Sequence, residues 1–156
     1  MKQVPKKNYV IFILMLIVVV IITFLGVRVY NDNIKTASVL YKYLKIIKSD
    51  ELDLYLNENP STVIYISNRY DASKEQLEKK LKSKIIDLNL YENFIYLDKE
   101  ELNVDFVNNF NKQNRTSITV DKMPILIIFN DNKVESVYYS LTEKDINELE
   151  FEGVRW

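Results

Sequence analysis

The feature that most constrains this chain is a run of 19 residues without a charged side chain, from Tyr9 to Val27. As an α-helix this run would reach about 28 Å, close to the thickness of a bilayer's hydrocarbon core. A helix packed inside a soluble protein would show a polar face, and this run has none. The sequence therefore predicts a transmembrane helix over residues 9–27, after a short N-terminal segment of residues 1–8.

A cleaved signal peptide is the alternative interpretation of this run. Signal peptides have an apolar stretch of about 7–15 residues that ends at a small-x-small cleavage site. Here the run is longer, Arg28 follows it, and the small cluster Thr36-Ala37-Ser38 comes too late in the sequence. These features favour a retained, single-pass membrane anchor.

The charges beside the run predict its orientation. Lys2, Lys6 and Lys7 precede it, whereas only Arg28 and Lys35 lie just after it. Basic residues are enriched on the cytoplasmic side of membrane helices. We therefore expect a cytoplasmic N-terminus and an extracytoplasmic C-terminal domain in the cell membrane.

Composition excludes several functions for the part that follows. Four of the 21 basic side chains and none of the 22 acidic ones lie in residues 1–30, so residues 31–156 carry a net charge of −5. A mildly acidic domain without a basic block is a poor nucleic-acid binder. The chain has no cysteine and no histidine, which removes disulfides, thiol nucleophiles, Cys/His zinc sites and histidine bases.

Apolar periodicity and turn residues predict one α/β domain over residues 49–156, after a linker and helix in residues 28–48. The expected helices are Ile34–Lys48, Asp50–Asn57 (capped by Ser49), Lys74–Ile86, Glu100–Asn111 and Leu141–Glu150 (capped by Thr142 with Asp145). The expected strands are Thr62–Ser67, Asn93–Leu97, Ile125–Phe129 and Lys133–Tyr139. Asn130-Asp131-Asn132 would make the tight turn between the last two strands, because Asp and Asn tolerate φ > 0.

Two segments resemble the thioredoxin family. Thr62–Leu81 (TVIYISNRYDASKEQLEKKL) is similar to the strand, loop and helix that carry the redox motif. Lys122–Tyr139 (KMPILIIFNDNKVESVYY) is similar to the segment of cis-proline, strand, turn and strand. Together they imply a thioredoxin-like, mixed four-stranded sheet with flanking helices. Thr62–Ser67 would be central, and Lys133–Tyr139 would lie at an edge. Small membrane-anchored accessory proteins of Gram-positive bacteria are the members that the chain resembles most.

The resemblance also predicts a site and the loss of its chemistry. Asp71-Ala72-Ser73-Lys74 falls where the family has Cys-x-x-Cys, and Pro124 falls on the family's cis-proline, so we expect the Met123–Pro124 bond to be cis. Thiol–disulfide exchange needs thiolates, and none can form here. The family's neighbouring surface meets extended peptides, so it becomes the candidate partner-binding surface: Arg69, Tyr70, Asp71, Ala72, Ser73, Lys74, Met123 and Pro124.

Two other groups of polar residues could form a catalytic or a cation-binding site, and each has a simpler structural explanation. Asp71, Ser73 and Lys74 could in principle form an acid, a nucleophile and a base, but Ser73 as a helix N-cap explains the same residues. The acidic group that follows Leu97 could gather a hard cation, although a solvated first helical turn is the simpler explanation. That group consists of Asp98, Glu100 and Glu101. No metal and no cofactor is predicted.

Two functions remain open from the sequence. The first is a non-catalytic, membrane-anchored binding module, an adaptor or subunit of a bacterial cell-envelope, secretion or transport complex with a protein or peptide partner. The second is an envelope enzyme with a carboxylate-based, non-redox site. A narrower variant of the first is an accessory or self-protection factor for a secreted peptide. A pocket with converging carboxylates would favour the enzyme, and an open surface beside Pro124 would favour binding.

Overall fold

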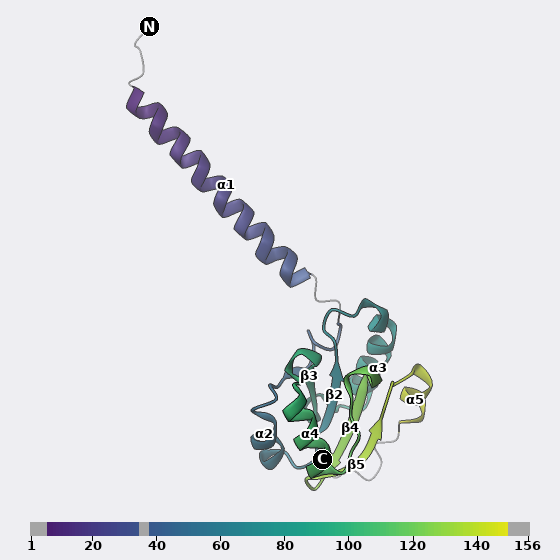
Figure 1. Ribbon diagram of the computed structural model, residues 1–156. Coiled ribbons are helices and arrows are strands. Elements are labelled where there is room, and N and C mark those ends of the chain that lie inside the picture. The colour runs from purple at the N-terminus through teal and green to yellow at the C-terminus, as the bar shows by residue number, and fades with distance from the viewer. Residues whose placement is uncertain (1–5, 35–37, 150–156) are drawn as a thin grey trace. The chain divides into compact units, whose positions relative to one another are not determined.

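The computed structural model describes residues 6–34 and 38–149 (Figure 1). The chain divides into two compact units, residues 1–36 and residues 37–156.

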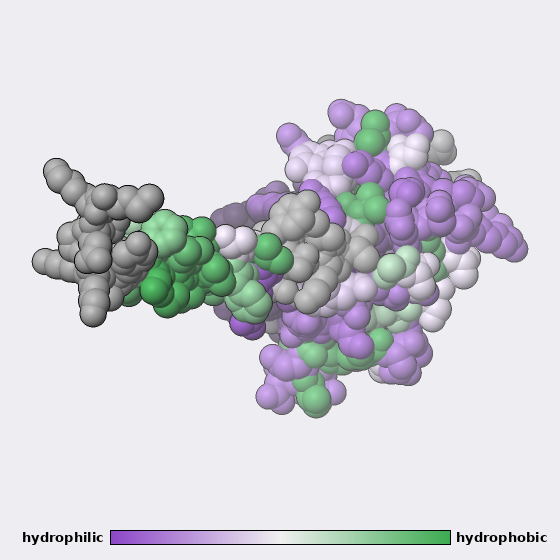
Figure 2. Space-filling model, turned by 90° about the horizontal axis from the view of Figure 1, so that it is seen from above, coloured by the Kyte–Doolittle hydropathy of each residue, from purple (hydrophilic) through white to green (hydrophobic). Residues whose placement is uncertain are grey.

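The first unit contains one long helix, α1, which spans Lys6–Ile34. It includes the predicted span, and it continues as a helix to Ile34, into the region predicted as a linker and helix in residues 28–48. Its stretch Ile11–Val29 has a mean hydropathy of 2.9 and is long and apolar enough to cross a membrane, a test that a signal sequence also passes. Figure 2 shows the apolar side chains of this stretch as a continuous green surface.

The second unit is built on a five-stranded mixed sheet with the strand order β1-β3-β2-β4-β5. The strands are β1 (Lys45–Ile46), β2 (Val63–Ser67), β3 (Phe94–Asp98), β4 (Ile125–Asn130) and β5 (Lys133–Tyr138). The helices are α2 (Leu52–Glu58), α3 (Glu75–Asp87), α4 (Val104–Asn114) and α5 (Glu143–Glu148). Parallel pairing joins β1 to β3 and β3 to β2, whereas β4 runs antiparallel to both β2 and β5.

The predicted sheet order is confirmed. β2 lies at the centre between β3 and β4, and β5 lies at an edge. The sheet has five strands instead of the four expected, because the two residues of β1 pair with β3. The turn between β4 and β5 has φ of 49° at Asp131 and 62° at Asn132, as its Asp and Asn predicted. The Met123–Pro124 bond is cis.

The predicted helix over Ile34–Lys48 is wrong. Within its described part, a turn is followed by β1. The spacing of apolar residues resembles that of a helix, but these residues enter two different cores. Leu40 and Leu44 lie on one face of the sheet, whereas Ile47 lies on the other. One helical stripe cannot face both sides of a sheet.

Three helix starts also differ from the sequence prediction. α2 begins at Leu52 after Glu51, and Ser49 does not cap it. α4 begins at Val104, because the Asn103 side chain accepts a hydrogen bond from the Phe106 N–H. The capping box of Thr142 and Asp145 is confirmed and places the start of α5 at Glu143.

Helices cover both faces of the sheet. Alternate strand residues point to opposite faces, so Tyr65 and Tyr96 meet the α3 side chains Leu77 and Leu81, together with Ile146 of α5. On the other face, strand residues meet α2 and α4, and the chief contacts there are Ile64, Ile95, Ile127, Leu52 and Phe110. The result is a three-layer α/β/α domain (Figure 1).

Candidate partner-binding site

The sheet brings the predicted site residues to one end. β2 and β3 are parallel and in register from Val63–Phe94 to Ser67–Asp98, while Ile66 of β2 lies opposite Ile125, the first residue of β4. Three segments therefore meet at the same end of the sheet: those that leave β2 and β3, and the one that precedes β4. We refer to this region as the Arg69 end, formed by Arg69–Lys74, Asp98–Glu101 and Met123–Pro124.

The loop after β2 is shaped by Asp71. Its Oδ1 accepts hydrogen bonds from the backbone N–H of Ser73 at 2.9 Å and from the Ser73 hydroxyl at 2.6 Å. The hydrogen bond from the Ser73 hydroxyl is the main cause that lowers the pKa of Asp71, with help from the charge of Lys74. The expectation that Ser73 acts as the N-cap is wrong, because Asp71 caps the short 3-10 helix Ala72–Lys74. A carboxylate with a lowered pKa is also a weak proton acceptor, which gives no support to Asp71 as a catalytic base.

Arg69 is the centre of charge at this end. Its guanidinium pairs with Asp98, with Nε 3.2 Å from Oδ2, and also with Glu100. Nη1 donates to the Tyr41 hydroxyl at 3.2 Å, and the guanidinium lies 4.8 Å from the centre of the Tyr70 ring. The hydrogen bond to Tyr41 and the two carboxylates raise the pKa of Arg69, so the side chain is a fixed cation.

Two carboxylates at or just after the end of β3, those of Asp98 and Glu100, form ion pairs with Arg69. Asp98 is buried, which raises its pKa, and the charge of Arg69 opposes that rise. Its Oδ1 accepts from the Glu100 N–H at 3.2 Å and begins the short 3-10 helix Lys99–Glu101. Among the described residues, no group of three His, Cys, Asp or Glu side chains converges as a metal site would require. The hypothesis of a cation site at Asp98, Glu100 and Glu101 therefore gains no support.

The segment before β4 leaves a backbone position open. The Lys122 carbonyl accepts from the Ser140 N–H at 2.7 Å, and the Pro124 carbonyl accepts from the Leu141 N–H at 2.9 Å. Between them, the N–H and carbonyl of Met123 form no hydrogen bond with any residue that the structure describes. The Met123 side chain is half-buried against the core, while Pro124 is buried. The backbone of Met123 is therefore unpaired among the described residues, and part of its side chain is exposed.

Tyr70 is the exposed aromatic residue of this end. Its side chain is 46% exposed and lies against the Arg69 guanidinium. Its backbone N–H donates to Asn68 Oδ1 at 3.0 Å, which fixes the start of the loop. An aromatic ring held over a cation and open to solvent is a favourable contact for an apolar or aromatic side chain of a partner.

Glu78 is a buried, hydrogen-bonded carboxylate that the sequence analysis missed. It lies on α3, four residues after Lys74, and its carboxylate is fully buried. Oε1 accepts from the hydroxyls of Ser38 at 3.0 Å and Tyr65 at 3.2 Å, while Oε2 accepts from the N–H groups of Val39 at 2.6 Å and Leu40 at 3.2 Å. Burial raises the pKa of Glu78 despite these donors. The only sequence signal was an acidic residue next to Leu77 and Leu81 on the apolar stripe of the helix.

Hollows in the domain surface lie at the opposite end of the sheet. Two neighbouring hollows there share Gln113, Asn114 and Asn132, and we refer to this region as the Asn132 end. The remaining lining comes from α2, from Arg115 after α4, from Phe129 of β4 and from the start of β5. None of the predicted site residues lines these two hollows.

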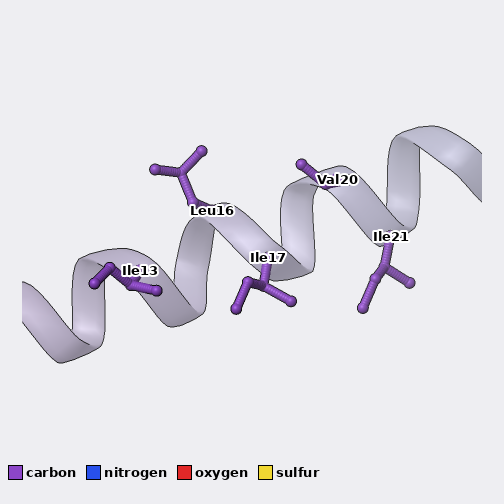
Figure 3. A pocket seen from close by; sticks show the side chains of 5 residues that line it. All are labelled: Ile13, Leu16, Ile17, Val20 and Ile21. Atoms are coloured by element: carbon purple, nitrogen blue, oxygen red, sulfur yellow. The ribbon is translucent and has the colours of Figure 1, made fainter.

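The face of α1 in Figure 3 is a shallow surface between side chains. Ile13, Leu16, Ile17, Val20 and Ile21 line it, and they point away from the helix in different directions. The residues from Ile11 to Val27 are all exposed, and none of them is charged. This part of the helix is therefore apolar around its whole circumference.

Comparison with known proteins finds similarity to solved structures alone. No family model and no curated protein matches the chain. Thioredoxin O2 from Arabidopsis thaliana, in the oxidised state, is similar to it with 12% identity and a TM-score of 0.48, over 72% of this chain and 96% of that one. A chain from a structure on thiol resolution in yeast mitochondrial 1-Cys peroxiredoxin has 17% identity and a TM-score of 0.46, over 70% and 98%.

Strand order and direction define the second unit as a thioredoxin-like domain. The central β2 is followed by a loop and α3, a parallel β3 lies on one side of it, and an antiparallel β4 begins at a cis-proline on the other. No residue of the chain is a cysteine, so none of them can carry out the thiol exchange that the loop performs in redox-active thioredoxins.

Proposed function

We propose that this protein is a non-catalytic binding module that is anchored in the membrane and receives an extended protein or peptide segment at the Arg69 end. The observation that carries the proposal is the open backbone of Met123, which lies at the same end of the sheet as the exposed ring of Tyr70. An extended segment would pair with the N–H and carbonyl of Met123, as in strand addition. Tyr70 and the adaptable side chain of Met123 would supply the apolar contact.

The carboxylates favour binding over catalysis. Asp71 is tied to Ser73, Asp98 is tied to Arg69, and Glu78 is buried beneath four donors. Each of them already serves a structural partner, and they do not converge on a common hollow. The carboxylate-based enzyme that the sequence left open therefore has no observation in its favour.

The anchor is the second element of the proposal. The apolar circumference of α1 suits a lipid environment, where every face of a single helix meets acyl chains. Lysines before the span favour a cytoplasmic N-terminus, which would place the domain outside the cell. Such a protein would serve as an adaptor or subunit of a bacterial envelope, secretion or transport complex.

Location is tested by protease treatment of intact protoplasts. The proposal expects digestion of the domain and survival of an N-terminal fragment that contains α1. A full-length chain that the protease does not cut would show the opposite orientation. A mature protein that starts after residue 30 would show that α1 is a signal sequence.

Binding is tested by crosslinking the full-length protein in its native membranes and identifying the products by mass spectrometry. Met123→Asp places a charge where the partner's segment would lie, and Lys133→Asp makes a matched change in a strand at the other end. We expect a discrete product whose yield falls at least fivefold for Met123→Asp and stays unchanged for Lys133→Asp. Equal yields from a Met123→Asp variant that circular dichroism shows to be folded would contradict the proposal.

A further inference from the structure

The segment that follows α1 in sequence docks onto the Arg69 end. α1 ends at Ile34, and only three residues separate it from Ser38, which lies within the domain. The backbone N–H of Ser38 donates to the Arg69 carbonyl at 3.0 Å. The chain therefore enters the domain directly against the loop that carries the candidate binding surface.

Glu78 holds this segment in place. Its two carboxylate oxygens together receive the Ser38 hydroxyl and the N–H groups of Val39 and Leu40. Ser38 Oγ in turn accepts from the Tyr41 N–H at 3.0 Å, which closes a turn over the carboxylate. Hydrogen bonds to a buried charge are stronger than neutral ones, so Glu78 is the main attachment of residues 38–41.

The same segment also holds the loop. The Tyr41 hydroxyl accepts from Arg69 Nη1, and its ring packs edge-on against Tyr96 with ring centres 5.3 Å apart. Arg69 thus makes one backbone contact and one side-chain contact with residues 38–41. Glu78 and the loop are also joined through α3, because the 3-10 helix Ala72–Lys74 leads directly into it.

From these contacts we infer that Ser38–Tyr41 is a latch that orders the loop Asn68–Lys74, so that release of this segment loosens the candidate binding surface. The inference rests on the proposed function for its biological meaning, because it names how that surface would be regulated. Displacement of this segment from Glu78 and Arg69 would then alter partner binding.

Amide hydrogen exchange on the full chain in lipid nanodiscs tests the latch without a partner. Glu78→Met removes the carboxylate at similar side-chain volume and releases the N–H groups of Val39 and Leu40. We expect these amides, and those of Tyr70, Asp71 and Ser73 in the loop, to exchange about tenfold faster or more. The amide of Ile127 in β4 should keep its wild-type rate, which shows that the release is local.

Two further variants keep the inference falsifiable if Glu78→Met unfolds the domain. Tyr41→Phe removes the hydroxyl that binds Arg69 and leaves Glu78 in place, and it should speed exchange in the loop severalfold. Glu78→Gln can turn its amide so that the oxygen still accepts from Val39 and Leu40, and it should restore most of the protection. Loop exchange at the wild-type rate in Tyr41→Phe, or in a folded Glu78→Met protein with released Val39 and Leu40, would overturn the latch.

Crosslinking in native membranes separates failure of the latch from failure of the proposed function. A loosened loop with reduced partner yield in Glu78→Met supports both. A loosened loop with full yield keeps the latch but shows that the Arg69 end is not the binding surface. A loop that does not loosen overturns the latch, whatever the yield.

Discussion

The two ends of the sheet are built from different interactions. At the Arg69 end and in the neighbouring α3 and residues 38–41, an arginine, two buried carboxylates and a tyrosine hydroxyl join segments that are distant in sequence. At the Asn132 end, contacts are neutral: the Asn132 N–H donates to the Pro60 carbonyl at 3.0 Å, and Thr62 and Phe129 exchange backbone hydrogen bonds. A protein loses much stability when the partner of a buried charge is removed. The stability of a turn without charges depends mainly on its backbone conformation. The comparison therefore predicts that variants at the Arg69 end cost more than matched variants at the Asn132 end.

Loss of the Glu78 carboxylate should have the largest effect. Glu78→Met leaves buried N–H and hydroxyl groups of Ser38, Val39, Leu40 and Tyr65 without their acceptor, which should lower the free energy of unfolding by about 3 kcal/mol. Urea denaturation of the full chain in detergent, followed by circular dichroism, measures this loss. A change below about 0.5 kcal/mol would show that the network contributes little to stability.

Removal of the Arg69 charge should rank second. Arg69→Met leaves Asp98 buried beside no cation, and the expected cost is about 2 kcal/mol. Lys133→Met removes an exposed cation at the Asn132 end and should change stability by less than about 0.5 kcal/mol. Equal losses of unfolding free energy for Arg69→Met and Lys133→Met in the same experiment would contradict the predicted difference between the two ends.

The turn at the Asn132 end gives a smaller and purely conformational effect. Asn132 has φ of 62°, a left-handed conformation that a β-branched residue adopts with difficulty. Asn132→Val should cost about 1–2 kcal/mol, whereas Asn132→Gly should be close to neutral. The thermal midpoints of the two variants provide the measurement, and a Val variant as stable as the Gly variant would contradict this account of the turn.

Sequence patterns were sufficient for the centre of the fold. β-branched and aromatic runs identified β2, β3 and β4, and the Asp131-Asn132 pair identified the hairpin, because these signals depend on neighbouring residues. The entering segment was missed, since the fate of Leu40, Leu44 and Ile47 depends on β3 and α3, which are far away in sequence. The site was only partly predictable for the same reason. Tyr70 and Met123 followed from the family resemblance, but the roles of Glu78 and Tyr41 arise from long-range packing.

The smallest expected effect is a change of stability with pH. This change should have opposite signs for two glutamates of α3, Glu78 and Glu75. Burial raises the pKa of Glu78 above its ordinary 4.5, so the folded state binds this proton more tightly than the unfolded state. The wild type should therefore lose stability relative to Glu78→Gln as the pH rises from about 4.5 through the raised pKa. Glu75, whose pKa is lowered chiefly by its hydrogen bond with Lys79, should show the opposite sign against Glu75→Gln. Denaturation midpoints at several pH values test both signs, and a difference between wild type and Glu78→Gln that does not change with pH would contradict the first.

The central claim is that the Arg69 end meets a partner and the Asn132 end does not. Site-specific photo-crosslinking in native membranes tests it directly, with the photoreactive residue placed at position 70 in one protein and at position 132 in another. The account predicts a discrete crosslinked product from position 70 that disappears when Met123→Asp is added, and none from position 132. A product from position 132 alone, or one from position 70 that survives Met123→Asp unchanged, would contradict it.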